Sequence, residues 1–415
     1  MTVVQRTVRV HCFLDGVGFG GSGKRIITNA VNLKPLDVDF YIYAPIETIK
    51  RLITQFGTER CSLITFHNVG RYSDGQRALT DESIRQLARE FKSGDVIHLV
   101  APWTIPWRYR RSVLYSYVNV YFPLQSKLTA IRKIITKFTE RQATKRTNVE
   151  FIEPTSNASS TIFINTLKRL LISTYVELKV LILMRVCSRV DILNPELYEY
   201  ATFICGAKKV SLTRGLASHA QFMDRTKSTG RKDKVVFLGR FERQKGIHYL
   251  IKTIPALAEL AMCQRRRVEI CLVGAGTFKA QLIDLACRFN GDFIKVDVFE
   301  TNEIEATLRD AKIFLSLQQY SNYPSQSLIE AMTFGVLPIV TKTGLSQLMV
   351  PEGYRYLISE AEIVEKLPEL IFEILSLTEI EFQDKSLSVL DHVNSSIFDQ
   401  TQAKYYLELY RQLSY

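Results

Sequence analysis

The sequence predicts an α/β protein built on parallel, doubly wound sheets. Apolar runs of strand length alternate with amphipathic helical segments in both halves of the chain, and this alternation is typical of strands joined by crossover helices. The length of 415 residues favours two domains rather than one. A hydrophobic content of 46% and a charged content of 23% are ordinary for a soluble globular protein.

The first half begins with a strand that leads into a glycine-rich loop. The predicted strands are 8–15, 37–45, 61–69 and 94–102, and the predicted helices are 24–33, 46–56 and 81–91. Segment 208–216 reads as the last strand of the first domain, and 214–232 as the linker. The apolar run 161–187 is long enough to span a membrane, but four charges lie within its middle (Lys168, Arg169, Glu177 and Lys179). An amphipathic core helix is therefore favoured.

The second half repeats the alternation. Strands are predicted at 234–239, 267–273, 293–298, 312–317 and 337–341, and helices at 245–260, 277–289, 302–311 and 325–334. The final segment, 399–415, has helical periodicity.

The segment from Ser316 to Thr341 carries the strongest functional signal. It reads as a strand end, a polar turn with a proline, a helix that carries Glu330, a stop at Gly335 and a second strand. The N-terminus of a helix presents unpaired N–H groups and a partial positive charge, so it suits a phosphate. A carboxylate one to two turns later is placed to reach the hydroxyls of a ribose beside that phosphate.

A second motif lies upstream, in residues 235–251. There a buried strand ends in Gly239-Arg240, and Lys245-Gly246 opens the next helix. Two cations and a helix N-terminus at the carboxyl ends of strands are the expected arrangement for holding a diphosphate. The plain alternative is a pair of surface cations, with Glu330 as a capping or pairing residue. A lysine at a helix N-terminus opposes the helix dipole, however, and is easier to explain if an anion binds there.

These two motifs, in this order, resemble those of the retaining GT-B glycosyltransferases of the glycosyltransferase family 4 type, also called group 1. The resemblance is good from Val235 to Gly344 and weaker elsewhere. It implies two Rossmann-like domains facing a cleft, with a nucleotide-sugar donor held mainly by the second. The family's counterparts of Arg240 and Lys245 bind the donor diphosphate, and that of Glu330 holds the donor ribose.

The same resemblance divides the chain into three parts. It implies an acceptor domain at 1–215, a nucleotide-sugar domain at 216–398, and a helix at 399–415 that crosses back to the first domain.

The sequence departs from the family at one acidic position. The family usually has another glutamate eight residues before the one that Glu330 matches, and here that position is Asn322, beside Ser321. Asn322 can hydrogen-bond a sugar hydroxyl, but it cannot stabilise positive charge as a carboxylate does. We assign it to the catalytic group together with Arg240 and Lys245.

Further donor-binding residues are expected around these motifs. Glycines at strand ends let a helix start close to the sheet and let ligand approach the backbone. The loop after the strand at 293–298 is where the family places the nucleobase, although Phe299 there also fits plain packing. The expected donor-binding set, besides Glu330 and the first glycine-rich loop, is Gly239, Gly274, Gly276, Phe299, Ser325 and Gln326.

The first loop, 16–25, is open to three interpretations. Residues 18–24 spell GFGGSGK, which has the spacing of a P-loop, but Arg25 stands where a serine or threonine should bind magnesium. The family has a glycine-rich loop at this place whose backbone approaches the donor or acceptor, a role matched by Gly20 and Gly21. The third interpretation is a tight turn without a ligand.

No cluster of His, Asp and Glu has metal-ligand spacing in the sequence. We therefore expect a metal-independent reaction without a cofactor, in which the donor phosphate takes the acceptor proton and the cations stabilise the leaving diphosphate. The stretch 118–127, comparable to a family loop that often carries a histidine, has none, and His98 is expected to be a packed residue.

The net charge of +12 and a pI near 9.2 indicate an anionic partner. No nucleic-acid-binding motif is present, so an anionic membrane surface is the favoured partner. Basic residues gather beside aromatic ones in the first half, as an interfacial surface requires, although a solvated helix face beside a core strand fits equally. The basic residues are Arg108, Arg110, Arg111, Lys127, Arg132, Lys133, Lys137, Arg141, Lys145 and Arg146, and the aromatic ones are Trp103, Trp107, Tyr109, Tyr115, Tyr117 and Phe122.

Localisation is predicted from cysteine usage and the N-terminus. The seven cysteines form no CxxC pair and mostly lie in apolar runs, which favours free thiols in a reducing compartment. The first residues enter a strand without a secretion signal. We expect a cytoplasmic protein with peripheral contact to the inner membrane face.

The leading hypothesis is a retaining hexosyltransferase. It would move a sugar from a UDP- or GDP-linked donor to a glycan or lipid-linked acceptor, in cell-surface polysaccharide assembly. The rival is a catalytically degenerate GT-B protein that binds a nucleotide or glycan or serves as a partner subunit. A P-loop NTPase is third. Turnover of a sugar donor separates the first two.

Overall fold

The computed structural model describes residues 7–14, 21–70, 79–103, 105–117, 174–213, 215–216, 218–223, 230–301, 303–320, 322–398 and 401–414. Two compact units make up the chain. One contains Leu14–Arg71 and Thr213–Leu409, and the other contains Val8–Phe13, Tyr72–Leu212 and Tyr410–Tyr415. The domain boundaries proposed at 215 and 398 stay predictions.

The first sheet has seven strands in the order β3-β2-β1-β4-β5-β6-β7. The pairings of β2 with β3, β1 with β4, and along β4 to β7 are all parallel. The predicted elements of this half are confirmed to within a few residues. The strands are β1 (Val8–Phe13), β2 (Val38–Ala44), β3 (Thr65–Asn68), β4 (Val96–Leu99), β5 (Val113–Tyr117), β6 (Arg189–Ile192) and β7 (Val210–Leu212), and the helices are α1 (Gly21–Leu33), α2 (Ile46–Phe56), α3 (Thr58–Cys61), α4 (Asp81–Ala88) and α7 (Tyr198–Cys205).

Strand β5 corrects the interpretation of the aromatic residues as one interfacial surface. Tyr115 lies within β5 with 2% of its surface exposed, and Trp103 is 8% exposed, so both belong to the core. Trp107, in contrast, is 65% exposed. All four residues from Val113 to Ser116 are buried, as in a strand covered on both faces, a pattern that the neighbouring arginines concealed. Phe122 and the basic residues from Lys127 to Arg146 lie outside the described residues.

The apolar run 161–187 is helical from 174 to 186, and its first part lies outside the described residues. Val180, Leu183 and Met184 are buried on one side of this helix, whereas Leu178 and Ile182 are exposed. One face of this helix is therefore buried, as a core helix requires, whereas its exposed face carries apolar as well as charged side chains. That the helix is amphipathic stays a prediction. Within the described part of the chain, no helix is both long enough and apolar enough to cross a membrane.

The second sheet has six strands in the order β10-β9-β8-β11-β12-β13, and its strand pairings are all parallel. All its strands except β13 are predicted from the sequence. They are β8 (Lys232–Leu238), β9 (Val268–Val273), β10 (Ile294–Phe299), β11 (Ala311–Ser316), β12 (Leu337–Thr341) and β13 (Leu357–Ile358).

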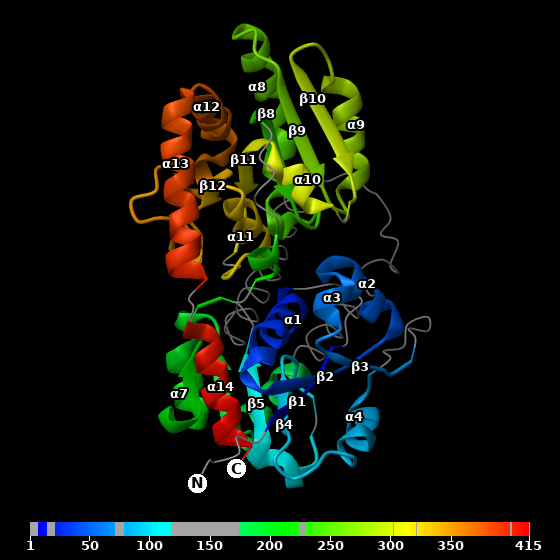
Figure 1. Cartoon of the computed structure of the whole chain (residues 1–415). Coiled ribbons are helices and arrows are strands. Elements are labelled where there is room, and N and C mark those ends of the chain that lie inside the picture. The colour runs from blue at the N-terminus through cyan, green and yellow to red at the C-terminus, as the bar shows by residue number, and fades with distance from the viewer. Residues whose placement is uncertain are drawn as a thin grey trace, which may run out of the picture. The chain divides into compact units, whose positions relative to one another are not determined.

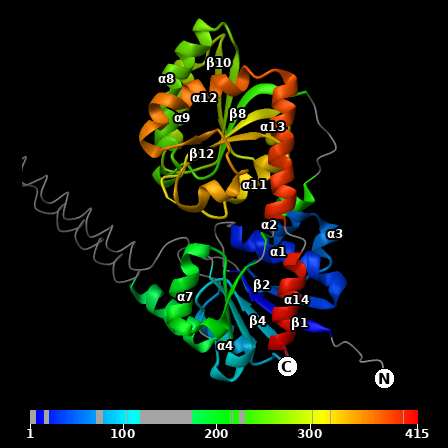
Figure 2. The same cartoon turned by 90° about the vertical axis from the view of Figure 1, so that its left-hand side faces the viewer.

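Helices cover both faces of this second sheet (Figures 1 and 2). α8 (Ile247–Cys263) packs against α9 (Lys279–Phe289) and α12 (Ile363–Leu375), while α11 (Gln326–Thr333) packs against α13 (Glu379–His392). The strand order runs outward from β8 in one direction and from β11 in the other. Loops on the two sides of this switch diverge at the carboxyl ends of the strands, which is where doubly wound proteins bind ligands.

The last helix, α14 (Thr401–Leu413), ends in buried polar contacts made by Tyr410, which belongs to the same unit as β1 and β4 to β7. The Tyr410 hydroxyl lies 2.8 Å from Nδ1 of His98, and Nε2 of His98 lies 2.7 Å from Oγ of Ser116. Ser116 donates a 3.0 Å hydrogen bond to Asp191. All four side chains are buried, which confirms the expectation that His98 is a packed residue.

Candidate functional site

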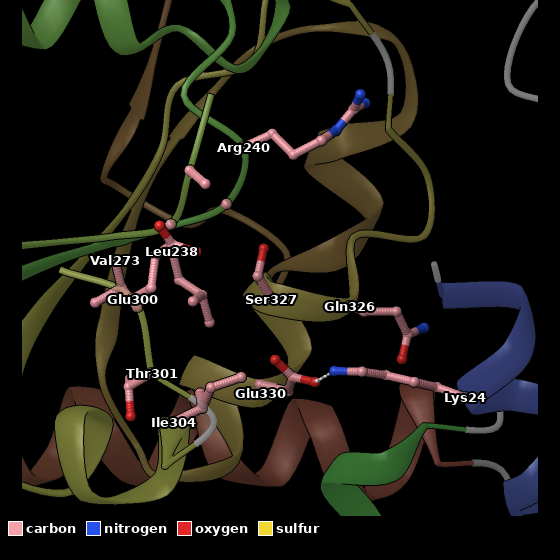
Figure 3. Close-up of a pocket in the computed structure, with 13 residues that line it drawn as sticks. Lys24, Leu238, Arg240, Val273, Glu300, Thr301, Ile304, Gln326, Ser327 and Glu330 are labelled. Atoms are coloured by element: carbon pink, nitrogen blue, oxygen red, sulfur yellow. Dashed lines mark hydrogen bonds and ion pairs between the residues drawn. The ribbon is translucent and has the colours of Figure 1, made fainter. Parts of the chain in front are cut away.

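A cavity of about 570 Å³ opens at the carboxyl ends of the strands of the six-stranded sheet, at its topological switch. Figure 3 shows the side chains around it. The ends of β8 and β9, the loops after β8, β9 and β10 and the first turns of α11 supply most of its wall, and Ile304 of α10 (Ile304–Arg309) and Lys24 of α1 complete it. The lining residues that carry polar chemistry are Lys24, Arg240, Glu300, Thr301, Gln326, Ser327 and Glu330.

The turn after β8 positions Arg240 and Lys245. Arg240 lines the cavity, whereas Lys245 does not and instead donates a 3.2 Å hydrogen bond from Nζ to Oε1 of Gln318. Burial, and then the positive charge of Arg240, lowers the pKa of Lys245 to about 8. A half-buried ammonium held beside another cation favours an anion between or beside the two.

Gly246 fixes the path of this turn into α8. It has a φ of +79°, and a Cβ built on it would lie 1.7 Å from the carbonyl oxygen of Leu317. Only glycine fits such a left-handed residue against a neighbouring backbone. The sequence pair Lys245-Gly246 is thus explained by the close passage of the turn beside the end of β11.

Gly274 and Gly276 bring the loop after β9 against the loop after β8. A Cβ on Gly274 would lie 2.0 Å from the carbonyl oxygen of Gly239, and one on Gly276 would lie 2.6 Å from that of Phe241. The amide of Phe241 also donates to the carbonyl of Ala275 at 2.8 Å. Gly239 and Gly274 line the cavity and Gly276 does not, so the glycine pair shapes one wall out of bare backbone.

Helix α11 points its N-terminus at the cavity. Its N-cap, Ser325, is buried and makes no side-chain capping hydrogen bond. Gln326, the first helical residue, lines the cavity, and neither its Nε2 nor its Oε1 has a hydrogen-bond partner although both atoms are buried. The first N–H groups of a helix lack partners within the helix. A site with free N–H donors and a free buried amide is suited to an oxygen-rich ligand.

Glu330 lies one turn further along α11 and points into the cavity. Its side chain is 2% exposed, and Oε1 accepts a 2.7 Å hydrogen bond from Nζ of Lys24 (Figure 3). Lys24 is in the first turn of α1, within the same compact unit. Sequence reasoning assigned no role to Lys24 beyond the P-loop interpretation. The glycine-rich loop before it was the signal, but no sequence pattern connects residues so far apart.

The other predicted site residues fall around this cavity rather than in it. Gly20 lies outside the described residues, and Gly21 is the first residue of α1. Asn322 is half-buried in the turn before α11, and it does not line the cavity. Phe299 lines a second cavity, of about 320 Å³. Sequence analysis did not single out Glu300, which lines the main cavity and pairs with Lys279 at 2.6 Å.

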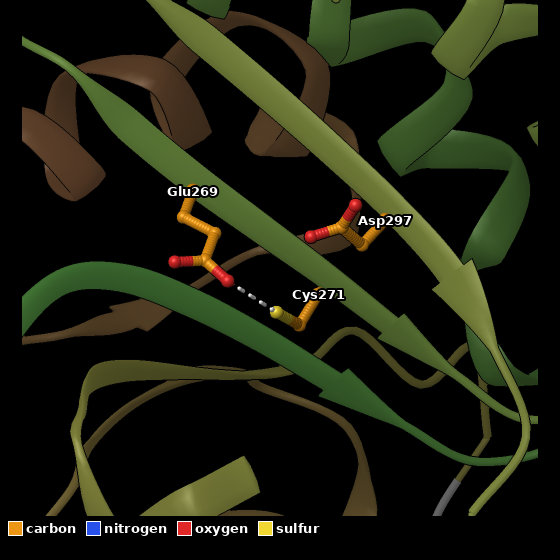
Figure 4. A group of neighbouring side chains, drawn as sticks. All are labelled: Glu269, Cys271 and Asp297. Carbon is orange, nitrogen blue, oxygen red and sulfur yellow. Dashed lines mark hydrogen bonds between the residues drawn. The ribbon is translucent and has the colours of Figure 1, made fainter.

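In the described part of the chain, one group of side chains has the geometry to hold a cation (Figure 4). Glu269 and Cys271 of β9 and Asp297 of β10 place one ligand atom each within 4.8 Å of one another. Their charges already have partners, because Lys295 pairs with Asp297 at 2.6 Å and Lys234 approaches Glu269 at 4.0 Å. Burial raises the pKa of Cys271 to about 12, so its thiol is protonated. We therefore interpret this group as a network of paired charges on the sheet rather than as a cation site.

Residues 219–385 match the family model described as "Glycosyl transferases group 1". This segment is thus similar to the domain of group 1 glycosyltransferases. It contains the whole cavity wall except Lys24. The prediction that the chain is a glycosyltransferase is thereby confirmed. No match to a curated protein was found.

Solved glycosyltransferase structures share the fold of the entire chain. HepE of Anabaena, in complex with UDP-glucose, is 14% identical and superposes with a TM-score of 0.58 over 97% of this chain and 98% of its own. Sucrose-phosphate synthase of Thermosynechococcus elongatus is 16% identical, with a TM-score of 0.60 over 98% and 99% of the two chains. A point mutant of TarM of S. aureus, in complex with fondaparinux, alpha-GlcNAc-glycerol and UDP, is 11% identical, with a TM-score of 0.64 over 97% and 99%.

These likenesses establish the fold of this glycosyltransferase. Both sheets, their parallel strands and their helical layers have the GT-B arrangement of two Rossmann-like domains. The predicted α/β fold class is confirmed.

Proposed function

We propose that this protein is a retaining glycosyltransferase of family 4 that transfers a sugar from a nucleoside diphosphate to a glycan or lipid-linked acceptor. The observation that carries the proposal is the cavity at the topological switch, where Arg240, the N-terminus of α11 and Glu330 meet. A cation and helix N–H donors suit a diphosphate. A buried carboxylate suits the paired hydroxyls of a ribose.

In the proposed reaction the bond between the anomeric carbon and the diphosphate oxygen breaks. The acceptor hydroxyl forms its bond on the same face of the sugar, and its proton passes to the leaving phosphate. Negative charge therefore grows on the diphosphate as the bond breaks. Arg240, Lys245 and the α11 N-terminus stabilise that charge, the work for which other transferases recruit a divalent cation. We accordingly propose a metal-independent reaction with no cofactor.

The donor-binding roles follow the same geometry. Gly239, Gly274 and Gly276 let the diphosphate and ribose approach bare backbone, and Ser325 and Gln326 present the start of α11. Asn322 and Gly20–Gly21 are proposed to contact the transferred sugar. Phe299 is proposed to face the nucleobase from the strand end beside Glu300. Among UDP and GDP donors we favour UDP, because HepE and TarM were crystallised with UDP-containing ligands.

The second candidate is a GT-B protein that binds a nucleotide sugar without transferring it. The presence of Asn322 where a carboxylate usually stands favours it. In that case a nucleotide would bind, but its sugar would be neither hydrolysed nor transferred.

We also propose that the protein works on cell-surface polysaccharide at the inner face of a membrane. Trp107 is 65% exposed, and the guanidinium of Arg110 lies 4.1 Å from its ring centre. An exposed indole beside arginines fits the boundary between lipid headgroups and acyl chains. Co-sedimentation with anionic and with neutral vesicles tests this, and equal retention of wild type and Trp107→Ala on anionic vesicles would oppose it.

The first experiment is a thermal-shift panel of UDP, GDP, ADP and their common sugar conjugates without metal. We expect one diphosphate to stabilise the wild type and to lose its effect in Arg240→Ala. The matched control is Arg243→Ala, because Arg243 is an exposed cation of the same turn that does not line the cavity. If no nucleotide shifts the wild type, the donor-site assignment fails. Release of free sugar from the bound donor then separates the enzyme from the binding protein.

A further inference from the structure

The Lys24–Glu330 pair is a buried ion pair in the wall of the cavity. The side chain of Glu330 is 2% exposed and that of Lys24 is 12% exposed, with 2.7 Å between the charged atoms. Taking both charges out of water is costly, so such a pair is weak as a stabilising device. Because stabilisation alone does not explain this ion pair, its position in the cavity wall suggests a role in ligand binding.

Lys24 is also unfavourably placed in its own helix. It lies in the first turn of α1, which has no acidic residue in that turn. A cation there opposes the helix dipole. The ammonium of Lys24 and the N-terminus of α1 together attract negative charge, and Glu330 supplies one negative charge there.

The charges that line the cavity leave room for a further anion. Lys24 and Arg240 are positive and Glu330 is negative, while Glu300 is already paired with Lys279. Lys245 follows in the same turn and adds another cation, whose pKa is lowered by burial and then by the charge of Arg240. An ammonium has three N–H donors, and Glu330 takes one of them. The unpartnered amide of Gln326 in the same wall is an independent indication that the site suits a polar ligand.

We propose that Lys24 is a donor-binding residue that bridges Glu330 and a phosphate oxygen of the nucleotide. Glu330 keeps oxygen lone pairs for the ribose while its Oε1 orients the ammonium towards the diphosphate. The inference rests on the proposed donor site. It adds a ligand from α1 to a site otherwise formed by the group 1 domain.

The test distinguishes two roles of Lys24: binding a phosphate of the nucleotide, or only neutralising the charge of Glu330. Affinities for uridine, UMP and UDP, and for the guanine series, are measured by calorimetry on wild type, Lys24→Met, Glu330→Gln and the double variant. In the Glu330→Gln background, Lys24 has no carboxylate to neutralise. There we expect Lys24→Met to weaken UDP about tenfold or more and to leave uridine unchanged. Lys24→Arg, which keeps the charge, should retain most of the phosphate contribution.

Equal UDP affinity in Glu330→Gln and in the double variant would overturn the proposal and leave Lys24 a counter-ion. Thermal denaturation of the ligand-free variants supplies the folding control. Lys24→Met alone should be less stable than the double variant, because it leaves a buried carboxylate without its cation. If Arg240→Ala binds UDP as the wild type does, the donor site itself fails. If Arg240→Ala loses UDP affinity but the Lys24 variants bind UDP as their parents do, the donor site is supported and the inference about Lys24 fails.

Discussion

Arg240 depresses the pKa of Lys245. Burial is the larger cause, and together they bring the pKa to about 8 from an ordinary value of 10.5. In the ligand-free protein the unfolded chain therefore holds a proton between pH 8 and 10.5 that the folded chain releases. The stability contributed by this group rises with pH across that window.

A bound diphosphate should restore the proton on Lys245. We therefore expect nucleoside diphosphate affinity to fall as pH rises above about 8, by at most about tenfold per pH unit. Calorimetry from pH 7 to 10 measures it. Lys245→Arg, which stays charged throughout, should remove this part of the pH dependence, and an identical decline in that variant would show that another group is responsible.

Gly246 should be the least replaceable glycine of the site. Gly246→Ala places a Cβ 1.7 Å from the Leu317 carbonyl oxygen, whereas Gly353→Ala, with a φ of +70°, meets nothing within 4 Å. The left-handed backbone alone costs about 1 kcal/mol, so Gly353→Ala measures that part. We expect Gly246→Ala to cost at least twice as much because the backbone must also move. Similar melting temperatures for the two variants would contradict the predicted clash.

Asn322 offers a test of whether a missing carboxylate limits turnover. If Asn322 faces the transferred sugar, Asn322→Glu should raise the rate of transfer, because a carboxylate stabilises the positive charge that develops at the anomeric carbon. Asn322→Ala should lower it by about tenfold or more. Release of free sugar from UDP-sugar donors is the measurement. Unchanged rates in both variants would place Asn322 away from the reacting atoms.

The His98 network should contribute to the stability of the seven-stranded sheet. Ser116 makes hydrogen bonds with both His98 and Asp191, whereas Tyr410 contributes one to His98. Each lost buried hydrogen bond costs about 1 kcal/mol or more. We expect Ser116→Ala to lower the melting temperature more than Tyr410→Phe. The reverse order would mean that the contact of α14 matters more than the serine.

Local patterns made much of the fold and part of the site predictable. Each motif, the one with Gly239 and Lys245 and the one with Glu330, is a contiguous strand, turn and helix in the sequence. A doubly wound sheet brings the carboxyl ends of such strands together. The position of Arg240 in the cavity wall follows from its place after β8. Gly246 and Gly274 were identifiable because two backbone segments that pass so closely leave room only for glycine.

The remaining features depended on tertiary contacts. Lys24 meets Glu330 across 306 positions of sequence, and no periodicity records such a contact. β5 was missed because its buried Tyr115 lies close to arginines in the sequence, so that composition indicated a surface. Phe299 was placed correctly at a strand end, but the direction of its side chain towards the smaller cavity depends on the twist of the sheet.

The wall of the cavity is formed partly by backbone and partly by side chains. At Gly239 and Gly274 the wall is bare backbone, and a Cβ on Gly274 would lie 2.0 Å from the carbonyl oxygen of Gly239. Elsewhere the wall includes the side chains of Thr301 and Ile304. On the proposed function, donor preference is therefore open to redesign at Thr301 and Ile304, while the glycine backbone proposed to hold the diphosphate stays unchanged.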